Sequence, residues 1–141
     1  MTPIARHYWL DRLVQLYAQG EGCYPLQMGL SDDHWLALSV HNTAPSDVVL
    51  RRTLMSELIA SRKEERTQLA DWLACHMLPG AEPMHQIIAS VSLAFNHLWQ
   101  DLGLSSREEL RELMTDCFPQ LVEMNSENMR WKKFFYRQRC L

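Results

Sequence analysis

Residues 83–103 read PMHQIIASVSLAFNHLWQDLG and form the most apolar stretch of this 141-residue chain. Their apolar side chains recur at the three- and four-residue spacing that places side chains on one face of an α-helix. Pro83 suits the first turn of a helix, and Gly103 suits the left-handed residue that follows its end. The stretch therefore predicts one long, buried central helix, with an apolar face made of Met84, Ile87, Ile88, Val91, Phe95, Leu98, Trp99 and Leu102.

Upstream of this stretch, helix start signals divide the chain into further helices. Thr2-Pro3 predicts the start of the first helix, because a threonine followed by proline has the form of an N-cap and a first helical position. Ser31, followed by two aspartates, predicts a cap for the second helix. Ser46-Asp47 predicts the start of a long helical segment that reaches about residue 78.

Within that long segment, Ser61 and Glu64 have the spacing of a capping box, which predicts two helices meeting near Ala60. The run Arg62–Arg66 contains opposite charges at helical spacing. We expect this run to form a solvated helix face.

Downstream of Gly103, Ser105 and Glu108 predict another capping box, and Pro119 predicts a helix break. Asn125-Ser126 predicts the cap of the final helix. No stretch alternates apolar and polar residues with the two-residue period of a strand. The sequence therefore predicts an all-α fold: residues 1–141 form a single compact domain of about six or seven helices, with a basic and aromatic C-terminal helix.

The composition is that of a soluble globular protein, with 47% apolar and 22% charged residues. Its formal net charge is −3, but the charge is unevenly distributed. Residues 128–141 hold five of the 14 Lys and Arg residues and none of the 17 Asp and Glu residues. This basic end has two interpretations: it docks on the protein's own acidic body, or it binds an anionic partner.

The C-terminal segment separates its aromatic and basic side chains. Trp131, Phe134 and Phe135 share one helix face, which predicts that this face packs onto the helical body. A basic face beside Cys140 lies opposite, made of Arg130, Lys133 and Arg137. A stacking platform for nucleic acid needs aromatic and basic groups on the same side, so nucleic acid is the less favoured ligand. An anionic cofactor or an acidic protein partner held near Cys140 fits better.

The four cysteines are Cys23, Cys75, Cys117 and Cys140, and no two have the short spacing of a zinc site or a redox dithiol. The N-terminus has no basic stretch followed by an apolar run, so we expect no secretory signal, reduced thiols and a cytoplasmic location. The charge-free stretch 83–100 contains several polar residues. We therefore expect a buried helix there and no membrane segment.

Nothing in the residues indicates an enzyme. There is no glycine-rich phosphate loop, no nucleophile elbow and no metalloprotease motif. His85 and His97 are twelve positions apart and point to different helix faces. We expect these two and His76 to be core or helix-end histidines rather than metal ligands.

Three stretches together resemble a known family: His97–Leu104 (HLWQDLGL), Cys117–Leu121 (CFPQL) and Asn128–Leu141 (NMRWKKFFYRQRCL). They are similar to NifQ proteins, and the likeness also takes in residues 28–30 and 54–65. The resemblance implies a cytoplasmic, non-enzymatic carrier in nitrogenase iron–molybdenum cofactor biosynthesis. It implies a molybdenum–iron–sulfur (Mo-Fe-S) cluster as cargo, and the NifEN cofactor scaffold and the nitrogenase iron protein as partners. Soft thiolate ligands suit such a cluster.

The sequence departs from the family pattern near its end. In the family, the segment that matches Phe135–Cys140 is followed by a cysteine-rich tail of the form C-x4-C-x2-C-x5-C, which this sequence lacks. Either the sequence is a fragment whose main ligands lie beyond residue 141, which we expect, or the protein has lost its principal ligands. In both cases we expect that this chain does not bind a cluster tightly. Cys140 is the candidate metal ligand within the chain. Arg130, Lys133 and Arg137 are the candidates for offsetting cluster charge or binding a partner.

Overall fold

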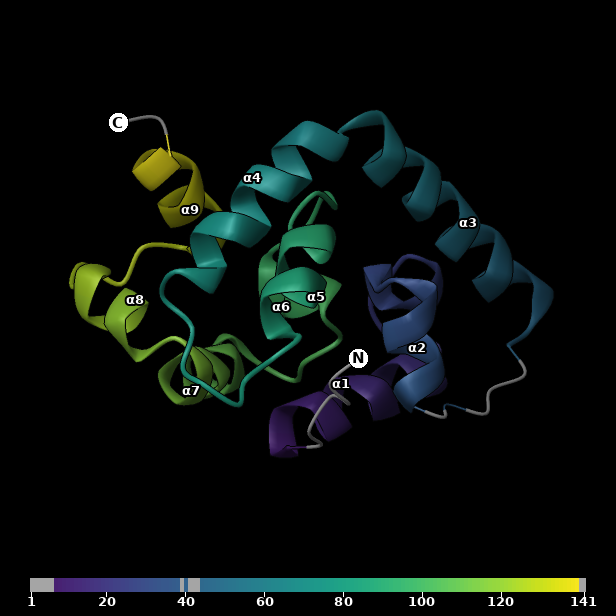
Figure 1. The fold of residues 1–141 in the computed structure, drawn as a ribbon, viewed down its shortest axis with the longest axis horizontal. Coiled ribbons are helices and arrows are strands. Elements are labelled where there is room, and N and C mark those ends of the chain that lie inside the picture. Colours follow the sequence, from purple (N-terminus) through teal and green to yellow (C-terminus); the bar gives the residue numbers. More distant parts are fainter. Residues whose placement is uncertain (1–6, 39, 41–43, 140–141) are drawn as a thin grey trace.

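The computed structural model describes residues 7–38, 40 and 44–139, and these contain nine α-helices, one 3-10 helix and no strand (Figure 1). The all-α prediction is confirmed. The helix number exceeds the predicted six or seven because two short helices, α6 and α8, were not anticipated. The elements are α1 (Tyr8–Ala18), η1 (Leu26–Gly29), α2 (Asp32–Leu38), α3 (Ser46–Ser61), α4 (Lys63–Ala74), α5 (Met84–Val91), α6 (Leu98–Asp101), α7 (Arg107–Cys117), α8 (Pro119–Met124) and α9 (Trp131–Arg139).

Helix α5 lies at the centre of the molecule, with α4 crossing it and α1 and α7 on the opposite side (Figure 1). Six of its eight residues are buried, including Ser90. The buried apolar residues of the described chain form one continuous core that reaches from α1 to α9. The apolar pattern that begins at Met84 therefore does locate the centre of the fold. No helix in the described part of the chain is both long and apolar enough to cross a membrane.

The prediction of one continuous helix from Pro83 to Leu102 is wrong. Helix α5 ends at Val91, and a turn region separates it from α6. The Ser92 N–H still donates to the Ile88 carbonyl at 2.9 Å, but the Leu93 and Ala94 N–H groups donate to the carbonyls of Ser90 and Val91, three positions back, so the α-helical pattern stops there. Phe95, a predicted member of the apolar face, is 85% exposed because it lies in this turn region.

The predicted capping boxes are only partly correct. The cap before α7 lies one residue later than predicted: Ser106 accepts from the Glu109 N–H at 3.1 Å, and the Glu109 carboxylate accepts from Ser105. The predicted box at Ser61 is wrong, because the Ser61 hydroxyl donates to the Leu58 carbonyl instead. The predicted break near Ala60 is confirmed, and it lies at Arg62.

The predicted start of the last helix is wrong, whereas the predicted start of the first helix is not tested. Helix α1 begins at Tyr8, where His7 Nδ1 accepts from the Leu10 N–H at 3.3 Å. The predicted start at Thr2-Pro3 lies outside the described residues. Helix α9 begins at Trp131, so the predicted cap at Asn125-Ser126 is wrong. Asn125 instead bridges the loop before α9 by donating to the Met129 carbonyl and accepting from its N–H.

The charged run 62–66 is only partly a solvated face. Arg62 and Glu65 form an exposed ion pair, as predicted. The prediction is wrong for Arg66, which turns inward: its Nε donates to Ser90 Oγ at 3.1 Å and its Nη2 donates to the Gly29 carbonyl at 3.0 Å. A Cβ at Gly29 would lie 2.4 Å from Ser90 Oγ, so the absent side chain permits this close packing of η1 on α5.

Candidate functional site

An ion pair between a buried aspartate and a partly buried lysine joins α6 to α9. Lys132 Nζ donates to Asp101 Oδ2 at 2.5 Å and to the Ala94 carbonyl at 2.8 Å. Asp101 has no solvent exposure. The Asn96 N–H donates to the same carboxylate oxygen at 3.3 Å, so the turn between α5 and α6 closes on the pair. The ion pair therefore fixes how α9 lies against the helical body.

The loop after α1 packs against the backbone of the same aspartate. The Cys23 N–H donates to the Asp101 carbonyl at 2.7 Å, and the buried Tyr24 hydroxyl donates to the Leu102 carbonyl at 2.6 Å. Gly22 has a φ of +76°, and a Cβ there would lie 2.6 Å from the Asp101 carbonyl oxygen. Only glycine fits this approach without displacing the chain. Asp101 is thus held by α9 through its side chain and by the 22–24 loop through its backbone.

The predicted aromatic face of α9 is buried, which confirms that it packs onto the body. Trp131, Phe134 and Phe135 are each at most 4% exposed. The rings of Phe134 and Phe135 lie 6.4 and 6.0 Å from Trp72 of α4. These edge-on and tilted ring contacts add to the hydrophobic burial. Because the aromatic rings are covered by protein, they are not available to stack on nucleic acid bases.

The three predicted basic residues remain at the surface. Arg130, Lys133 and Arg137 are exposed, and Arg137 Nη1 lies 3.8 Å from Met129 Sδ. Their predicted roles toward a cluster or partner stay predictions. Cys140 lies outside the described residues, so the predicted setting of a thiol beside cations does too.

Lys132 is the functional candidate that sequence reasoning missed. The prediction counted it only as part of the basic end, yet it is the cation that turns inward. The sequence did hold a signal: Asp101 is the only charge between Pro83 and Gly103, within a stretch predicted to be buried. A buried carboxylate requires a partner, and the basic segment supplies one.

The described cysteines are dispersed. Cys75 is exposed, Cys117 is buried and Cys23 lies between these extremes. Burial, helped by the nearby Asp116 charge, raises the pKa of Cys117 to about 12. Burial and the Asp101 charge raise the pKa of Cys23. No three His, Cys, Asp or Glu side chains in the described part of the chain come together in a way that could hold a metal ion.

The three histidines lie apart from one another. His76 Nδ1 pairs with Gln120 Oε1 at 2.7 Å on the surface, and His97 is the exposed N-cap residue of α6. His85 is half-buried, and its Nδ1 lacks a hydrogen-bond partner in the described structure. Burial lowers the pKa of His85, which favours its neutral form. His85 Nε2 lies 3.3 Å from Gln86 Nε2, so only the Nδ1 side of this ring lacks a partner.

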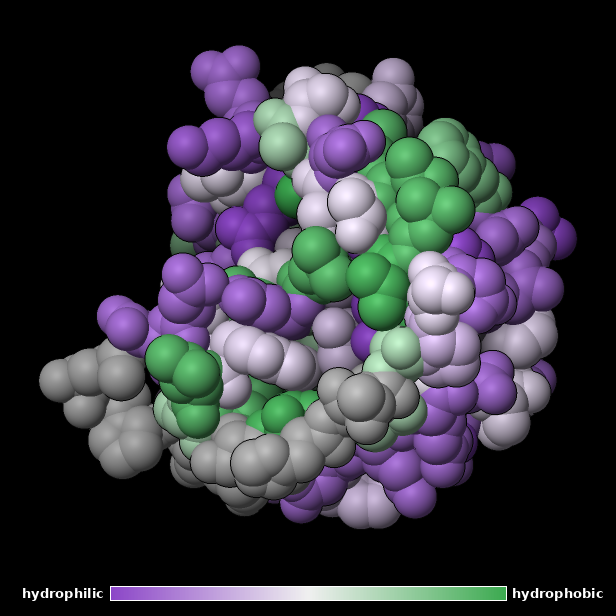
Figure 2. Space-filling view, turned by 90° about the vertical axis from the view of Figure 1, so that its right-hand side faces the viewer, coloured by the Kyte–Doolittle hydropathy of each residue, from purple (hydrophilic) through white to green (hydrophobic). Residues whose placement is uncertain are grey.

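Cys23 also lines a pocket of about 310 Å³ between the 20–24 loop and α3. Leu54, Met55 and Phe95 supply much of the apolar wall, and Arg51 lies at its side. Figure 2 shows hydrophobic side chains gathered on this side of the molecule, where α3 exposes Val49, Leu50 and Leu54. The raised pKa keeps the Cys23 thiol protonated at neutral pH, which disfavours its use as a thiolate ligand.

Comparisons with a family model and with curated proteins both give NifQ proteins as similar to this chain. A family model described as NifQ matches residues 9–141. The chain is similar to protein NifQ of Klebsiella pneumoniae, with 62% identity over 138 residues, which cover 94% of this chain and 83% of that protein. It is 37% identical over 150 residues to protein NifQ of Azotobacter vinelandii, covering 96% of this chain and 76% of that protein. No solved structure matches.

Proposed function

The chain belongs to the NifQ family, and on that premise we propose that it acts as a molybdenum carrier in nitrogenase iron–molybdenum cofactor biosynthesis. Its cargo would be molybdenum within an iron–sulfur cluster. Its partners would be the NifEN scaffold, which receives the molybdenum, and the nitrogenase iron protein. The proposal describes a cytoplasmic carrier without catalytic activity.

The observation that carries the proposal is the ion pair between Asp101 and Lys132. These residues come from the two most distinctive stretches of the family resemblance, 97–104 and 128–141, and Lys132 reaches the fully buried carboxylate of Asp101. The pair and the buried aromatic face together fix α9, so its outer face is held in a defined orientation. That face carries Arg130, Lys133 and Arg137. A thiolate-ligated cluster and molybdate are both anionic, so a fixed row of cations suits either one.

The ligands of the cargo are assigned to cysteines outside the helical body. The described residues offer no group of metal ligands, and two of their three cysteines have raised pKa values that oppose thiolate formation. We therefore assign the cluster to Cys140 and to the cysteine-rich segment found in the family. The helical body would orient that segment and neutralise part of its charge.

Anaerobic reconstitution with iron, sulfide and molybdate tests this assignment. The chain is compared with a version extended by the four-cysteine segment of the family, and with the same extension carrying four serines. Metal content is measured by mass spectrometry after gel filtration. We expect stoichiometric molybdenum and iron only in the four-cysteine version. Equal, stoichiometric metal in all three proteins would contradict the assignment.

A second candidate function is a binding module whose basic helix docks on an acidic protein surface. The exposed cations of α9 favour it, whereas the burial of Trp131, Phe134 and Phe135 argues against nucleic acid. Titration with generic RNA at several salt concentrations distinguishes the ligands. Strong, salt-dependent RNA binding would contradict the preference for a protein or metal partner.

A further inference from the structure

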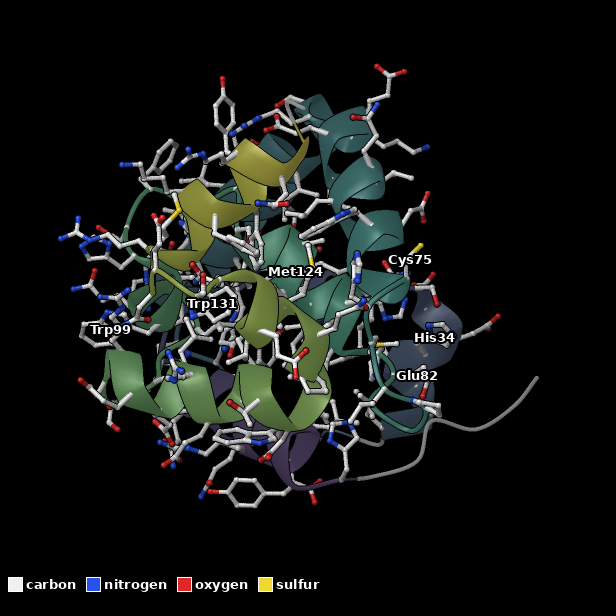
Figure 3. The ribbon with its side chains drawn as sticks, turned by 90° about the vertical axis from the view of Figure 1, so that its left-hand side faces the viewer. His34, Cys75, Glu82, Trp99, Met124 and Trp131 are labelled. Carbon is white, nitrogen blue, oxygen red and sulfur yellow. The ribbon has the colours of Figure 1, made fainter. Side chains whose placement is uncertain are left out.

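We propose that a pocket between α6, α7 and the start of α9 binds a small tetrahedral oxyanion. The pocket has a volume of about 170 Å³ and is lined by residues 97–99, Arg107, Leu110 and residues 130–132. In Figure 3, Trp131 lies near the start of α9, and Trp99 lies towards the edge of the molecule. The pocket is thus formed where the two distinctive sequence stretches meet α7.

Its charged groups are all positive. Arg107 and Arg130 line the pocket, and no carboxylate does. Lys132 also lines it, but its ammonium group is already paired with Asp101. Of the acids on the first turn of α7, Glu109 is paired with Arg12, and Glu108 does not line the pocket. The two arginines therefore leave the pocket with uncompensated positive charge.

A third arginine reinforces this charge. Arg107 Nη2 donates to the Asn128 carbonyl at 2.5 Å, and Arg111 Nη1 donates to Asn128 Oδ1 at 3.3 Å. These acceptors are neutral, so they orient the guanidinium groups without cancelling their charge. No ion pair of Arg107, Arg111 or Arg130 occurs among the described residues. Positioned guanidinium groups are the side chains best suited to bind planar or tetrahedral oxyanions.

The amino end of α9 adds backbone donors. The first backbone bond of this helix runs from the Phe134 N–H to the Arg130 carbonyl. No described residue accepts a hydrogen bond from the N–H groups of Trp131, Lys132 or Lys133. The first turn of α9 contains no acidic residue. Free N–H groups and the positive helix end both favour an anion at this position.

The size of the pocket limits the ligand. Sites for drug-sized molecules occupy roughly 300–1,000 Å³, so this pocket is too small for a nucleotide. A water molecule occupies about 30 Å³ in the liquid, so the volume accepts an ion of five heavy atoms with part of its hydration. Apolar walls from Leu98, Leu110 and the two indoles weaken the competition from water. Sulfate, phosphate and molybdate all have this size and shape.

The assignment of an oxyanion site rests on the pocket alone. Only the choice of molybdate as the natural member of this class rests on the proposed carrier function. Arg130→Gln removes a charge from the pocket, and Lys63→Gln removes the same charge from the exposed start of α4, outside the pocket. Because both residues are exposed, neither substitution is expected to unfold the protein, which circular dichroism checks.

The full chain is titrated with sodium sulfate, phosphate and molybdate in separate experiments, by calorimetry at low ionic strength. We expect saturable binding of one anion per chain, weakened at least about tenfold by Arg130→Gln and less than about twofold by Lys63→Gln. Absence of saturable binding for all three anions, or equal weakening by both variants, would overturn the proposal. Binding of sulfate and phosphate without molybdate would support the site and contradict molybdate as its ligand. Intact anion binding in a protein whose four-cysteine extension fails reconstitution would support the site and contradict the carrier function.

Discussion

The ammonium group of Lys132 lies 2.5 Å from Oδ2 of Asp101, a carboxylate that is fully excluded from solvent. The two residues are 31 positions apart in the sequence. Their contact joins α6, the short helix that follows the central helix α5, to the basic C-terminal helix α9. One side of α9 is therefore fixed by a charge pair and by aromatic packing, and the other side remains free to present cations.

Replacing Lys132 should strongly destabilise the protein. Lys132→Met leaves the Asp101 carboxylate buried without its partner, which costs about 3–5 kcal/mol in comparable sites. Lys133→Met is the matched control, because Lys133 is exposed on the same helix turn, and we expect it to change stability by less than about 0.5 kcal/mol. Urea unfolding measures both. Equal, small losses for the two variants would show that the ion pair does not hold α9.

Gly22 should tolerate a side chain much less well than Gly80. Both glycines have positive φ values, of +76° and +89°, so alanine is strained at each. A Cβ at Gly22 would also lie 2.6 Å from the Asp101 carbonyl oxygen, whereas a Cβ at Gly80 meets no atom within 4 Å.

We expect Gly80→Ala to cost about 1 kcal/mol and Gly22→Ala at least about 1 kcal/mol more, from the forced displacement of the loop. Thermal unfolding at one pH compares the two variants. A Gly22→Ala variant as stable as Gly80→Ala would contradict the close approach of the 22–24 loop to α6.

Arg66 should contribute more to stability than its neighbour Arg62. Arg66→Ala removes donors to Ser90 Oγ and to the Gly29 carbonyl, which are part of the contact between η1 and α5. We expect a loss of about 2–3 kcal/mol. Arg62→Ala breaks only an exposed ion pair with Glu65, worth at most about 1 kcal/mol. A larger loss for Arg62→Ala than for Arg66→Ala in urea unfolding would refute the inward position of Arg66.

The buried thiol of Cys117 should make stability depend on alkaline pH. Burial raises its pKa from 9.0 to about 12, so between these values the folded protein keeps a proton that the unfolded chain loses. Stability is therefore present below pH 9 and falls as the pH rises towards 12, by at most about 1.4 kcal/mol per pH unit from this group.

The free energy of unfolding is measured at pH 8 and pH 10 for the parent protein and for Cys117→Ala. Cys75→Ala is the control, because Cys75 is exposed. We expect the loss between the two pH values to be smaller in Cys117→Ala than in the other two proteins. The same loss in all three would exclude Cys117 as its source.

Helical periodicity predicted those features of the fold that depend on neighbouring residues. The burial of Trp131, Phe134 and Phe135 follows from their spacing, and the central position of α5 follows from its apolar residues. The break after Val91 was missed because periodicity continues through it. The turn after Val91 is held by Asp101, which accepts from the Asn96 N–H five positions before it, and by Lys132, which donates to the Ala94 carbonyl from 38 positions away.

Distant partners also explain the errors at charged residues. Arg66 was assigned to the surface because its local neighbours are charged, yet its acceptors are Gly29 and Ser90, which lie 37 and 24 positions away. Lys132 and Lys133 are adjacent identical residues, and composition cannot tell which one turns inward. The helix phase set by Trp131, Phe134 and Phe135 constrains the choice, but the buried Asp101 decides it.

The most direct test of the carrier proposal is a defined cofactor synthesis on purified NifEN scaffold with the nitrogenase iron protein. The family-extended chain, loaded with molybdenum and freed of excess molybdate, is supplied as the sole molybdenum source. The same protein prepared without molybdenum serves as the control. We predict that only the loaded protein gives molybdenum-containing cofactor on the scaffold. Retention of all molybdenum by the loaded protein, with no transfer to the scaffold, would contradict the account.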